Sequence, residues 1–292
     1  MKFACIHQHR GAFPLGLMCR VLAVARSGYY AWWHRAPSAR ARATAPLVAQ
    51  IRAAHAASHG TYGSPRIHAV LRATGQRVGR HRVAHLMRAA QVVGRPRRRR
   101  PRAAPRAAPR AMVGATANHL ARRFAVARWQ PDQAWVADLT YVPTREGALG
   151  LNVVLDLASR RVVGWAMGAA PDSALAGAAL RMALAQRRPA AGWLHHSDQG
   201  SQFTATAYQA LLQRAGAVVS CSRPGNCWDN AVMESFFHTL KGECGGPGRF
   251  PTRAAARQAI FAYLEIWYNR QRRHSSLGYR SPAEYEQQRS QA

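Results

Sequence analysis

Residues 135–142 read WVADLTYV, and this stretch decides the fold that the sequence predicts. Its apolar positions alternate with polar or small ones, as in a strand with one buried face. Further strand-like segments follow at 149–158, 161–167, 192–196 and 217–220. Helical patterns occupy the remaining segments, at 173–186, 204–215, 230–241 and 252–270. Three consecutive strands, followed by strands that alternate with helices, predict an α/β domain with a mixed five-stranded sheet.

Charge is distributed unevenly along the chain. The 292 residues carry a formal net charge of +30, and residues 1–131 contain 25 Lys and Arg but no acidic residue. All 12 acids lie in 132–292. Such a basic chain attracts polyanions, and its apolar runs are far shorter than the ~20 residues of a membrane helix. Five cysteines without framework spacing are typical of reduced thiols in a cytosol.

Residues 1–93 have helical patterns. A helix at 46–57 is followed by a glycine-containing break, after which Ser64 and Pro65 predict an N-cap and a first helical residue. Gly75 ends this second helix. The spacing of short helices around glycine-containing turns is typical of a helix-turn-helix, although a plain helical bundle with a basic face stays open.

A third helix is predicted at 80–90, with Arg80 and Arg82 on its outer face. In a helix-turn-helix this helix would enter the major groove of DNA. A further short helix pair is expected at 18–33. We therefore predict that Arg80 and Arg82 contact DNA.

Residues 94–110 carry eight arginines among Pro, Ala and Gly, including the run Arg97, Arg98, Arg99 and Arg100. Like charges at this density repel one another unless a polyanion neutralises them. We predict a linker that also follows phosphates. The expected organisation is a helical DNA-binding region at 1–93, a basic linker at 94–128 and a catalytic core at 129–292.

Three acids stand where phosphodiester chemistry would need them. Asp138 interrupts the apolar run of the first strand, Asp198 follows a short buried strand, and Glu234 lies among apolar residues of a helix. A charge in such surroundings is costly unless it is paired or binds a metal. Mg²⁺ prefers carboxylate oxygens, and two ions about 3.5–4 Å apart can assist hydrolysis. We predict that these three side chains converge at one edge of the sheet.

Several polar residues close to these acids in the sequence each have two possible roles. Asp156 is either a fourth metal ligand or structural, and we favour the structural reading. His195 and His196 either contact phosphate and steer a proton or make structural hydrogen bonds, with the second favoured. Asp229 and Asn230 are expected to cap the helix that carries Glu234. Glu243, beyond that helix, is expected to be solvated.

The acidic motifs resemble those of a known family. The strings at 135–142, 196–203 (HSDQGSQF) and 229–237 (DNAVMESFF), with 35 residues between Asp198 and Glu234, are similar to the DDE triad of transposases and retroviral integrases. Together with the tail YNRQRRHSSLGYRSPAEY at 268–285 and the YGSPRI string at 62–67, they resemble the second-reading-frame product of the insertion sequence three family. The resemblance covers nearly the whole chain.

This resemblance implies a ribonuclease-H-like core with Asp138, Asp198 and Glu234 as catalytic metal ligands for two Mg²⁺ ions, which Mn²⁺ can replace. The implied activity is cleavage at the ends of an insertion sequence and strand transfer of the freed 3′-hydroxyl. Lys241 lies nearly two helical turns after Glu234 on the same face. The resemblance makes it a phosphate contact, whereas the alternative is an exposed lysine near a helix end.

The same resemblance implies partners: double-stranded DNA at the element ends and the target, further copies of this chain on DNA, and an upstream-frame DNA-binding protein fused by frameshifting. We expect no membrane partner and a cytoplasmic, nucleoid-associated location in a bacterium. Two rival functions remain: a DNA-binding regulator of the element that does not cut, and a structured-RNA-binding protein of ribosomal type, which the charge alone permits.

Overall fold

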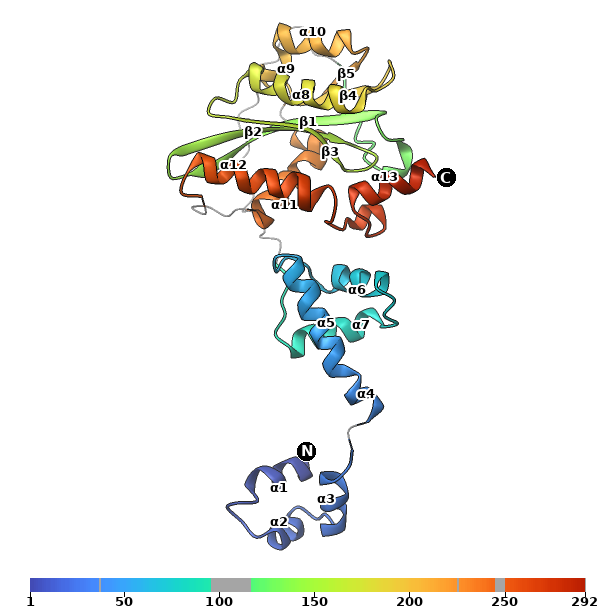
Figure 1. The fold of residues 1–292 in the computed structure, drawn as a ribbon, viewed down its shortest axis with the longest axis vertical. Helices are drawn as coiled ribbons and strands as arrows, with labels where there is room; N and C mark the ends of the chain where they lie inside the picture. The colour runs from blue at the N-terminus through green and yellow to red at the C-terminus, as the bar shows by residue number, and fades with distance from the viewer. Residues whose placement is uncertain (37, 96–116, 225, 245–249, 292) are drawn as a thin grey trace. The chain divides into compact units, whose positions relative to one another are not determined.

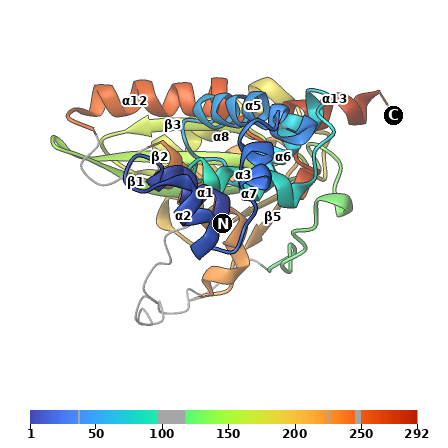
Figure 2. The same ribbon diagram turned by 90° about the horizontal axis from the view of Figure 1, so that it is seen from below.

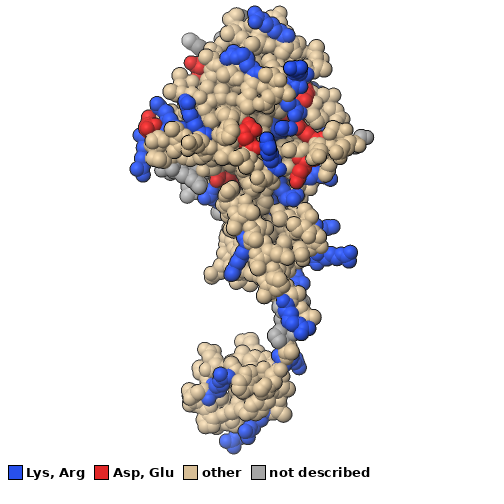
Figure 3. All heavy atoms as spheres, viewed as in Figure 1, with Lys and Arg blue, Asp and Glu red and all other residues tan. Residues whose placement is uncertain are grey.

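The structure is a computed structural model that describes all of the chain except residues 37, 96–116, 225, 245–249 and 292. It divides into two compact units, Met1–Ala53 and Ala54–Ala292. Within the described residues, no helix has the length and apolar character of a membrane span. In Figure 3 the acidic side chains lie on the sheet-containing part of the visible surface, whereas basic side chains occur over all of it.

The first unit is helical. It contains α1 (Lys2–His9), α2 (Leu15–Val21), α3 (Arg26–Trp33) and α4 (Ala39–Arg42), and the start of α5 (Thr44–Ala57). Ile6, Cys19 and Tyr29 form its small core, one from each of the first three helices. The helix pair expected at 18–33 is confirmed as α2 and α3.

The second unit begins with a pair of packed helices, α6 (Ser64–Ala73) and α7 (Arg80–Ala89). Gly75, with φ of +83°, turns the chain between them, as only glycine does without strain. The expected cap is wrong by one residue: Gly63 is the N-cap of α6, and no side chain caps this end. Their buried faces, as in a helix-turn-helix, meet through Ile67, Leu71, Val83, Leu86 and Met87.

A mixed five-stranded sheet forms the centre of this unit, as predicted, in the order β3-β2-β1-β4-β5. Its strands are β1 (Ala134–Thr144), β2 (Gly147–Asp156), β3 (Val162–Gly168), β4 (Leu194–Ser197) and β5 (Val218–Cys221). The first three are antiparallel neighbours, and β1, β4 and β5 run parallel. The parallel strands bring residues far apart in sequence to the same edge.

Helices cover both faces of the sheet (Figures 1 and 2). On one side lie α8 (Ser173–Arg187), α9 (Ser201–Thr204) and α10 (Thr206–Arg214), and on the other lie α11 (Ala231–Glu243), α12 (Arg253–Phe261) and α13 (Pro282–Ser290). Trp135 and Ala137 of β1 pack with Ala179 of α8 in the main core cluster. Because side chains alternate along a strand, Val136 and Asp138 face the α11 side.

Two helices depart from their expected form. The helix expected at 204–215 is shorter, forming α10 over Thr206–Arg214, and a separate short helix, α9, precedes it before Ala205, whose backbone is extended with ψ of 137°. The segment 252–270 is α-helical only through Phe261 and continues as a π-helix over Ala262–Tyr268. Short 3-10 turns at Val126–Arg128, Cys227–Asn230 and Ser275–Leu277 complete the regular structure.

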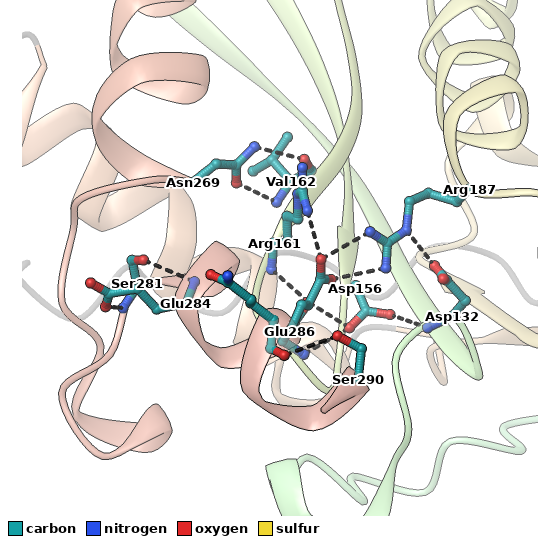
Figure 4. A network of polar contacts seen from close by, with 12 residues as sticks. Asp132, Asp156, Arg161, Val162, Arg187, Asn269, Ser281, Glu284, Glu286 and Ser290 are labelled. Carbon is teal, nitrogen blue, oxygen red and sulfur yellow. Dashed lines mark hydrogen bonds and ion pairs between the residues drawn. The ribbon is translucent and has the colours of Figure 1, made fainter. Parts of the chain in front are cut away.

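A polar network fastens the C-terminal helix α13 to the sheet (Figure 4). Glu286 of α13 accepts hydrogen bonds from Arg161 at 2.6 Å and from Arg187 Nη2, at the end of α8, at 2.9 Å. Arg187 Nε donates to Asp132, just before β1, at 2.8 Å. The bidentate contact between Arg187 and Glu286 fixes the orientation of both side chains. The network therefore holds α13 against α8 and the start of β1.

Candidate active site

Strand pairing brings two of the predicted acids to the same level. β1 and β4 are parallel neighbours, and Val136 lies opposite His196. Asp138 comes two residues after Val136, and Asp198 comes two residues after His196, directly beyond the end of β4. Adjacent strands lie about 4.8 Å apart. The two carboxylates therefore share one edge of the sheet.

The surroundings of Asp138 disfavour its charged form. Its Oδ1 accepts a hydrogen bond from the Leu139 backbone N–H at 2.7 Å. Burial, followed by the negative charges of Asp198 and Glu234, raises the pKa of Asp138 to about 7, and Lys241 acts in the opposite direction. Asp198, Glu234 and Lys241 therefore each lie within electrostatic range of Asp138.

Asp198 is held by the turn that follows it. Its Oδ1 accepts a hydrogen bond from the Gly200 backbone N–H at 2.9 Å, and burial raises the pKa of its carboxyl. Gly200 then begins α9 as its N-cap. Asp198 is thus half-buried on a fixed turn and aligned with Asp138.

Glu234 lies in the first turn of α11 and is exposed. Met233, Phe236 and Phe237 are buried and fix the rotation of this helix. The Asn230 side chain, at the start of α11, donates a hydrogen bond to the Ala137 carbonyl of β1 at 3.2 Å. The start of the helix is therefore fastened to the residue that precedes Asp138.

The three acids do not form a closed metal shell. Among the described residues, no three His, Cys, Asp or Glu side chains are gathered closely enough to hold one ion. No ion pair in the described part of the chain involves Asp138, Asp198 or Glu234. The site therefore has two aligned aspartates and, beside them, the long and flexible side chain of Glu234. No arginine in the described part of the chain forms an ion pair with any of the three.

The turn before α11 corrects one prediction. Asn230 occupies the N-cap position, but neither it nor Asp229 caps the helix through its side chain. Asp229 is fully buried and forms ion pairs with Arg122 at 2.7 Å and Arg223 at 2.8 Å. Hydrogen bonds from Arg223 and Arg122 hold the pKa of Asp229 well below its usual range, against the opposing effect of burial. This buried ion pair fixes the turn instead of a cap.

The C-terminal end of α11 corrects a second prediction, which concerns Glu243. Glu243, expected to be solvated, forms a bidentate pair with the buried Arg272 at 2.6 and 2.7 Å. Tyr263 also donates to Glu243 at 3.0 Å. Despite burial, the arginine keeps the pKa of Glu243 below its ordinary value. Both ends of α11 are therefore fastened by polar contacts on either side of Glu234 and Lys241.

Asp156 is structural. It is fully buried at the end of β2, where it pairs with Trp135, three residues before Asp138 on β1. Its two oxygens accept from the Asp132 N–H at 2.7 Å and from the N–H and hydroxyl of Ser159 at 2.7 and 2.8 Å. Burial raises its pKa to about 6. Internal donors occupy this carboxylate, so it is not a fourth ligand.

The two histidines are structural as well. His196 contacts Ser220 and Ser222 through its two ring nitrogens, at 2.9 and 3.1 Å, and His195 contacts Tyr208 at 3.0 Å. Both rings are buried, which lowers the pKa of His195 to about 3 and that of His196 to about 4. They are neutral at pH 7 and hold β4 against its neighbours.

The predicted DNA contacts divide into described and undescribed residues. Arg80 is exposed and Arg82 half-exposed at the start of α7, while Lys241 is half-exposed near the end of α11. Arg97–Arg100 lie outside the described residues. The sequence analysis overlooked Trp228, an exposed aromatic residue directly before Asp229 and Asn230. Its position directly before the 229–237 motif was the available signal.

Comparison with known families agrees with this geometry. Residues 128–227 and 215–282 match two models described as "Integrase core domain", and residues 42–100 match an "HTH-like domain". The catalytic core domain of BIV integrase overlays with a TM-score of 0.37 at 18% identity, covering 55% of this chain and 97% of that one, which is too loose to carry an argument. The family models and the sheet define an integrase-core protein of ribonuclease-H-like fold with a helix-turn-helix region.

Relatives that match over nearly the full length include proteins named as transposases. Transposase InsF for insertion sequence IS3A of Escherichia coli is 38% identical over 98% of both chains. "Insertion element IS600 uncharacterized 31 kDa protein" of Shigella sonnei is 43% identical over 92% of this chain and 97% of its own, and the IS904 transposase of Lactococcus lactis is 37% identical over 88% and 100%. The chain belongs to the IS3 family of transposases, and its function is DNA transposition.

Proposed function

We propose that Asp138, Asp198 and Glu234 bind two Mg²⁺ ions and catalyse cleavage at insertion-sequence ends and strand transfer of the 3′-hydroxyl. The observation that carries the proposal is the alignment of Asp138 and Asp198 on neighbouring strands, with Glu234 and Lys241 within electrostatic range of Asp138. Glu234 completes the set by rotation of its exposed side chain on the first turn of α11.

The donor set suits a hard divalent cation. Three carboxylates supply the oxygen ligands that Mg²⁺ prefers, and Mn²⁺ accepts the same set. A backbone N–H donates to Oδ1 of Asp138 and another to Oδ1 of Asp198. Bound Mg²⁺ supplies Lewis-acid stabilisation of the attacking and leaving oxygens. A cation also relieves the repulsion that raises the pKa of Asp138.

The remaining residues bind and orient DNA. Lys241 binds a phosphate beside the acids, Arg80 and Arg82 contact DNA from α7, and Arg97–Arg100 neutralise backbone phosphates. Counterion release makes this binding fall steeply with salt. We assign residues 1–93 to DNA binding, 94–128 to the basic linker and 129–292 to catalysis. The described residues 117–128 already contact the core, since Leu120 is buried and bonded to Ser220.

The assembly and setting follow from the same function. Joining two DNA ends to one target requires more than one active site, so copies of this chain bind DNA together in the bacterial cytoplasm, associated with the nucleoid. Fusion to an upstream-frame DNA-binding protein would add recognition of the element ends. Both features belong to the proposal.

The test is a cleavage and strand-transfer assay on element-end DNA. Wild type is compared with Asp138→Asn, Asp198→Asn and Glu234→Gln in Mg²⁺, in Mn²⁺ and without metal. We expect 3′-hydroxyl ends and joined products from wild type alone, and only with metal. If wild type and the three variants bind DNA but cut equally little, the chain is the non-catalytic regulator and the proposal is wrong.

A further inference from the structure

Trp228 is unusual among the tryptophans of the catalytic domain. Trp135 and Trp193 are buried and pack together with ring centroids 4.5 Å apart. Trp228 is 66% exposed, in the 3-10 turn directly before α11. A single exposed apolar residue is common at protein surfaces and means nothing alone. Its backbone support and its neighbours give this one significance.

The backbone that carries Trp228 is held firmly. The next residue, Asp229, is fully buried and accepts hydrogen bonds from Arg223 and Arg122. The one after, Asn230, is 5% exposed and donates to the carbonyl of Ala137. An indole ring that extends outward from such a turn is presented at low conformational cost, because its backbone is already ordered.

This turn lies beside the acids. Asn230 contacts the residue that precedes Asp138, and two residues of chain span at most about 7 Å. Glu234 lies one helical turn beyond Asn230. Successive nucleotides of one strand are about 3.4 Å apart along duplex DNA. The ring is therefore within a few nucleotides of any phosphate bound by Asp138 and Glu234.

The charges around the ring suit a nucleic-acid strand. The side chains of Arg122 and Arg223 are 44% and 58% exposed, and both pair with the single carboxylate of Asp229. Two guanidinium groups against one carboxylate leave a positive charge on this turn. An aromatic face beside a cationic surface is the combination that binds bases and backbone phosphates of single strands.

We propose that Trp228 stacks on an unpaired base next to the phosphodiester that is cut. The proposal rests on the catalytic function proposed above. In-line attack requires access to a phosphate in a duplex end. A base that becomes unpaired there loses its stacking contact and needs a new partner for that face. Stacking on an aromatic ring provides that partner and tolerates any base. The residue then acts in substrate positioning and leaves sequence recognition to other parts of the chain.

Binding to paired and frayed DNA ends tests the stacking without any cleavage. The dissociation constants of wild type, Trp228→Ala and Trp228→Phe are measured without divalent metal. One substrate is a fully paired duplex of the element end. The others are the same duplex with a single mismatch, placed at a different position in each. We expect wild type to prefer a mismatch beside the cleavage position, Trp228→Ala to lose roughly 5- to 100-fold of affinity for that substrate, and Trp228→Phe to retain most of it.

The control is Phe261→Ala, which removes another exposed aromatic ring, 49% exposed on α12. It should leave the mismatch preference intact, and thermal unfolding of Trp228→Ala should match wild type because the ring is mostly in solvent. An unchanged preference in Trp228→Ala overturns the proposal. So does a change confined to oligomeric state, which would make the ring a contact with a second copy. Because no cleavage is needed, loss of catalysis in the wild type would disprove only the catalytic function.

Discussion

Two groups of acids in the integrase core domain differ in the residues that contact their carboxylates. Asp229, Glu243 and Glu286 are each held by arginine side chains at 2.6–2.9 Å. Asp138 and Asp198 lie on neighbouring strands, and each accepts a hydrogen bond from a backbone N–H. The chain has 42 Lys and Arg for 12 acids, yet in its described part arginine ion pairs involve only Asp132, Asp229, Glu243 and Glu286. Arginine pairing therefore distinguishes these four carboxylates from Asp138 and Asp198.

The electrostatic consequences have opposite signs. Arginine partners lower the pKa of Asp229 and Glu243, so folding favours their charged forms. Burial and neighbouring acids raise the pKa of Asp138, so folding disfavours its charge. A carboxylate of the first kind contributes stability, whereas one of the second kind is maintained at some cost to stability. The following predictions test this distinction, in order of decreasing effect.

The largest effect is expected for Asp138→Asn. Substituting residues that only support a metal ligand typically costs 10- to 100-fold in activity, so losing a ligand should reduce cleavage by more than about a hundredfold. The metal-free variant should be at least as stable as wild type, because burial and the neighbouring acids already disfavour the charge of this carboxylate in the folded state. Gel-based cleavage and chemical denaturation measure the two properties. Marked destabilisation would place Asp138 in the structural group instead.

Glu243→Gln should have the largest effect on stability. It leaves Arg272, which is 3% exposed, without its bidentate partner. Breaking a buried pair in this way costs about 3–5 kcal/mol. Urea denaturation measures the change, and Glu146→Gln, at an exposed carboxylate that accepts only the Arg253 N–H, serves as the matched control. Equal stability of the two variants would contradict the assignment.

Asp229 should give a pH-dependent contribution to stability. Its pKa is depressed in the folded state, so its contribution is present above the unfolded value near 3.8 and is lost as pH falls below it. Asp229→Asn should cost about 2 kcal/mol at pH 7, the size of a charged hydrogen bond. The difference from wild type should shrink towards acid pH in thermal or urea unfolding. A difference that stays constant down to the lowest accessible pH would show that charge pairing is not its cause.

The smallest effect is expected for Lys241→Gln. Loss of one phosphate contact should reduce the slope of log affinity against log salt by about 1, equally for all DNA sequences. Stability should change by less than about 0.5 kcal/mol, as for most surface substitutions. Titrations at several salt concentrations measure the slope. An unchanged slope would leave Lys241 as an ordinary lysine near a helix end.

Much of the fold was predictable because the signals are local. Strand-like patterns, with period-two alternation in the first, predicted all five strands within a few residues, and Gly75 marked the turn between α6 and α7. The break at Ala205 and the π-helix from Ala262 carry no glycine or proline, so neither left a local signal. Tertiary packing decides such features.

The site was predictable only in part. Spacing and motif identified Asp138, Asp198 and Glu234, but the partners of the other acids come from distant positions, as Arg122 does for Asp229. In an arginine-rich chain any acid has many possible partners, so sequence does not say which pairs form. This is why the caps expected at 229–230 and the solvated Glu243 were wrong. The exposed ring of Trp228 likewise depends on packing.

The parallel pairing of β1 and β4 has a consequence for engineering. The register of these two strands aligns Asp138 with Asp198. The distance between the two aspartates is therefore determined by strand pairing and not by the long segment that connects them. The tip of the β1–β2 hairpin, at Arg145 and Glu146, is therefore a suitable place to insert a fluorophore-labelling tag. A label attached there would report on this domain without changing the distance between Asp138 and Asp198, which the strand pairing determines.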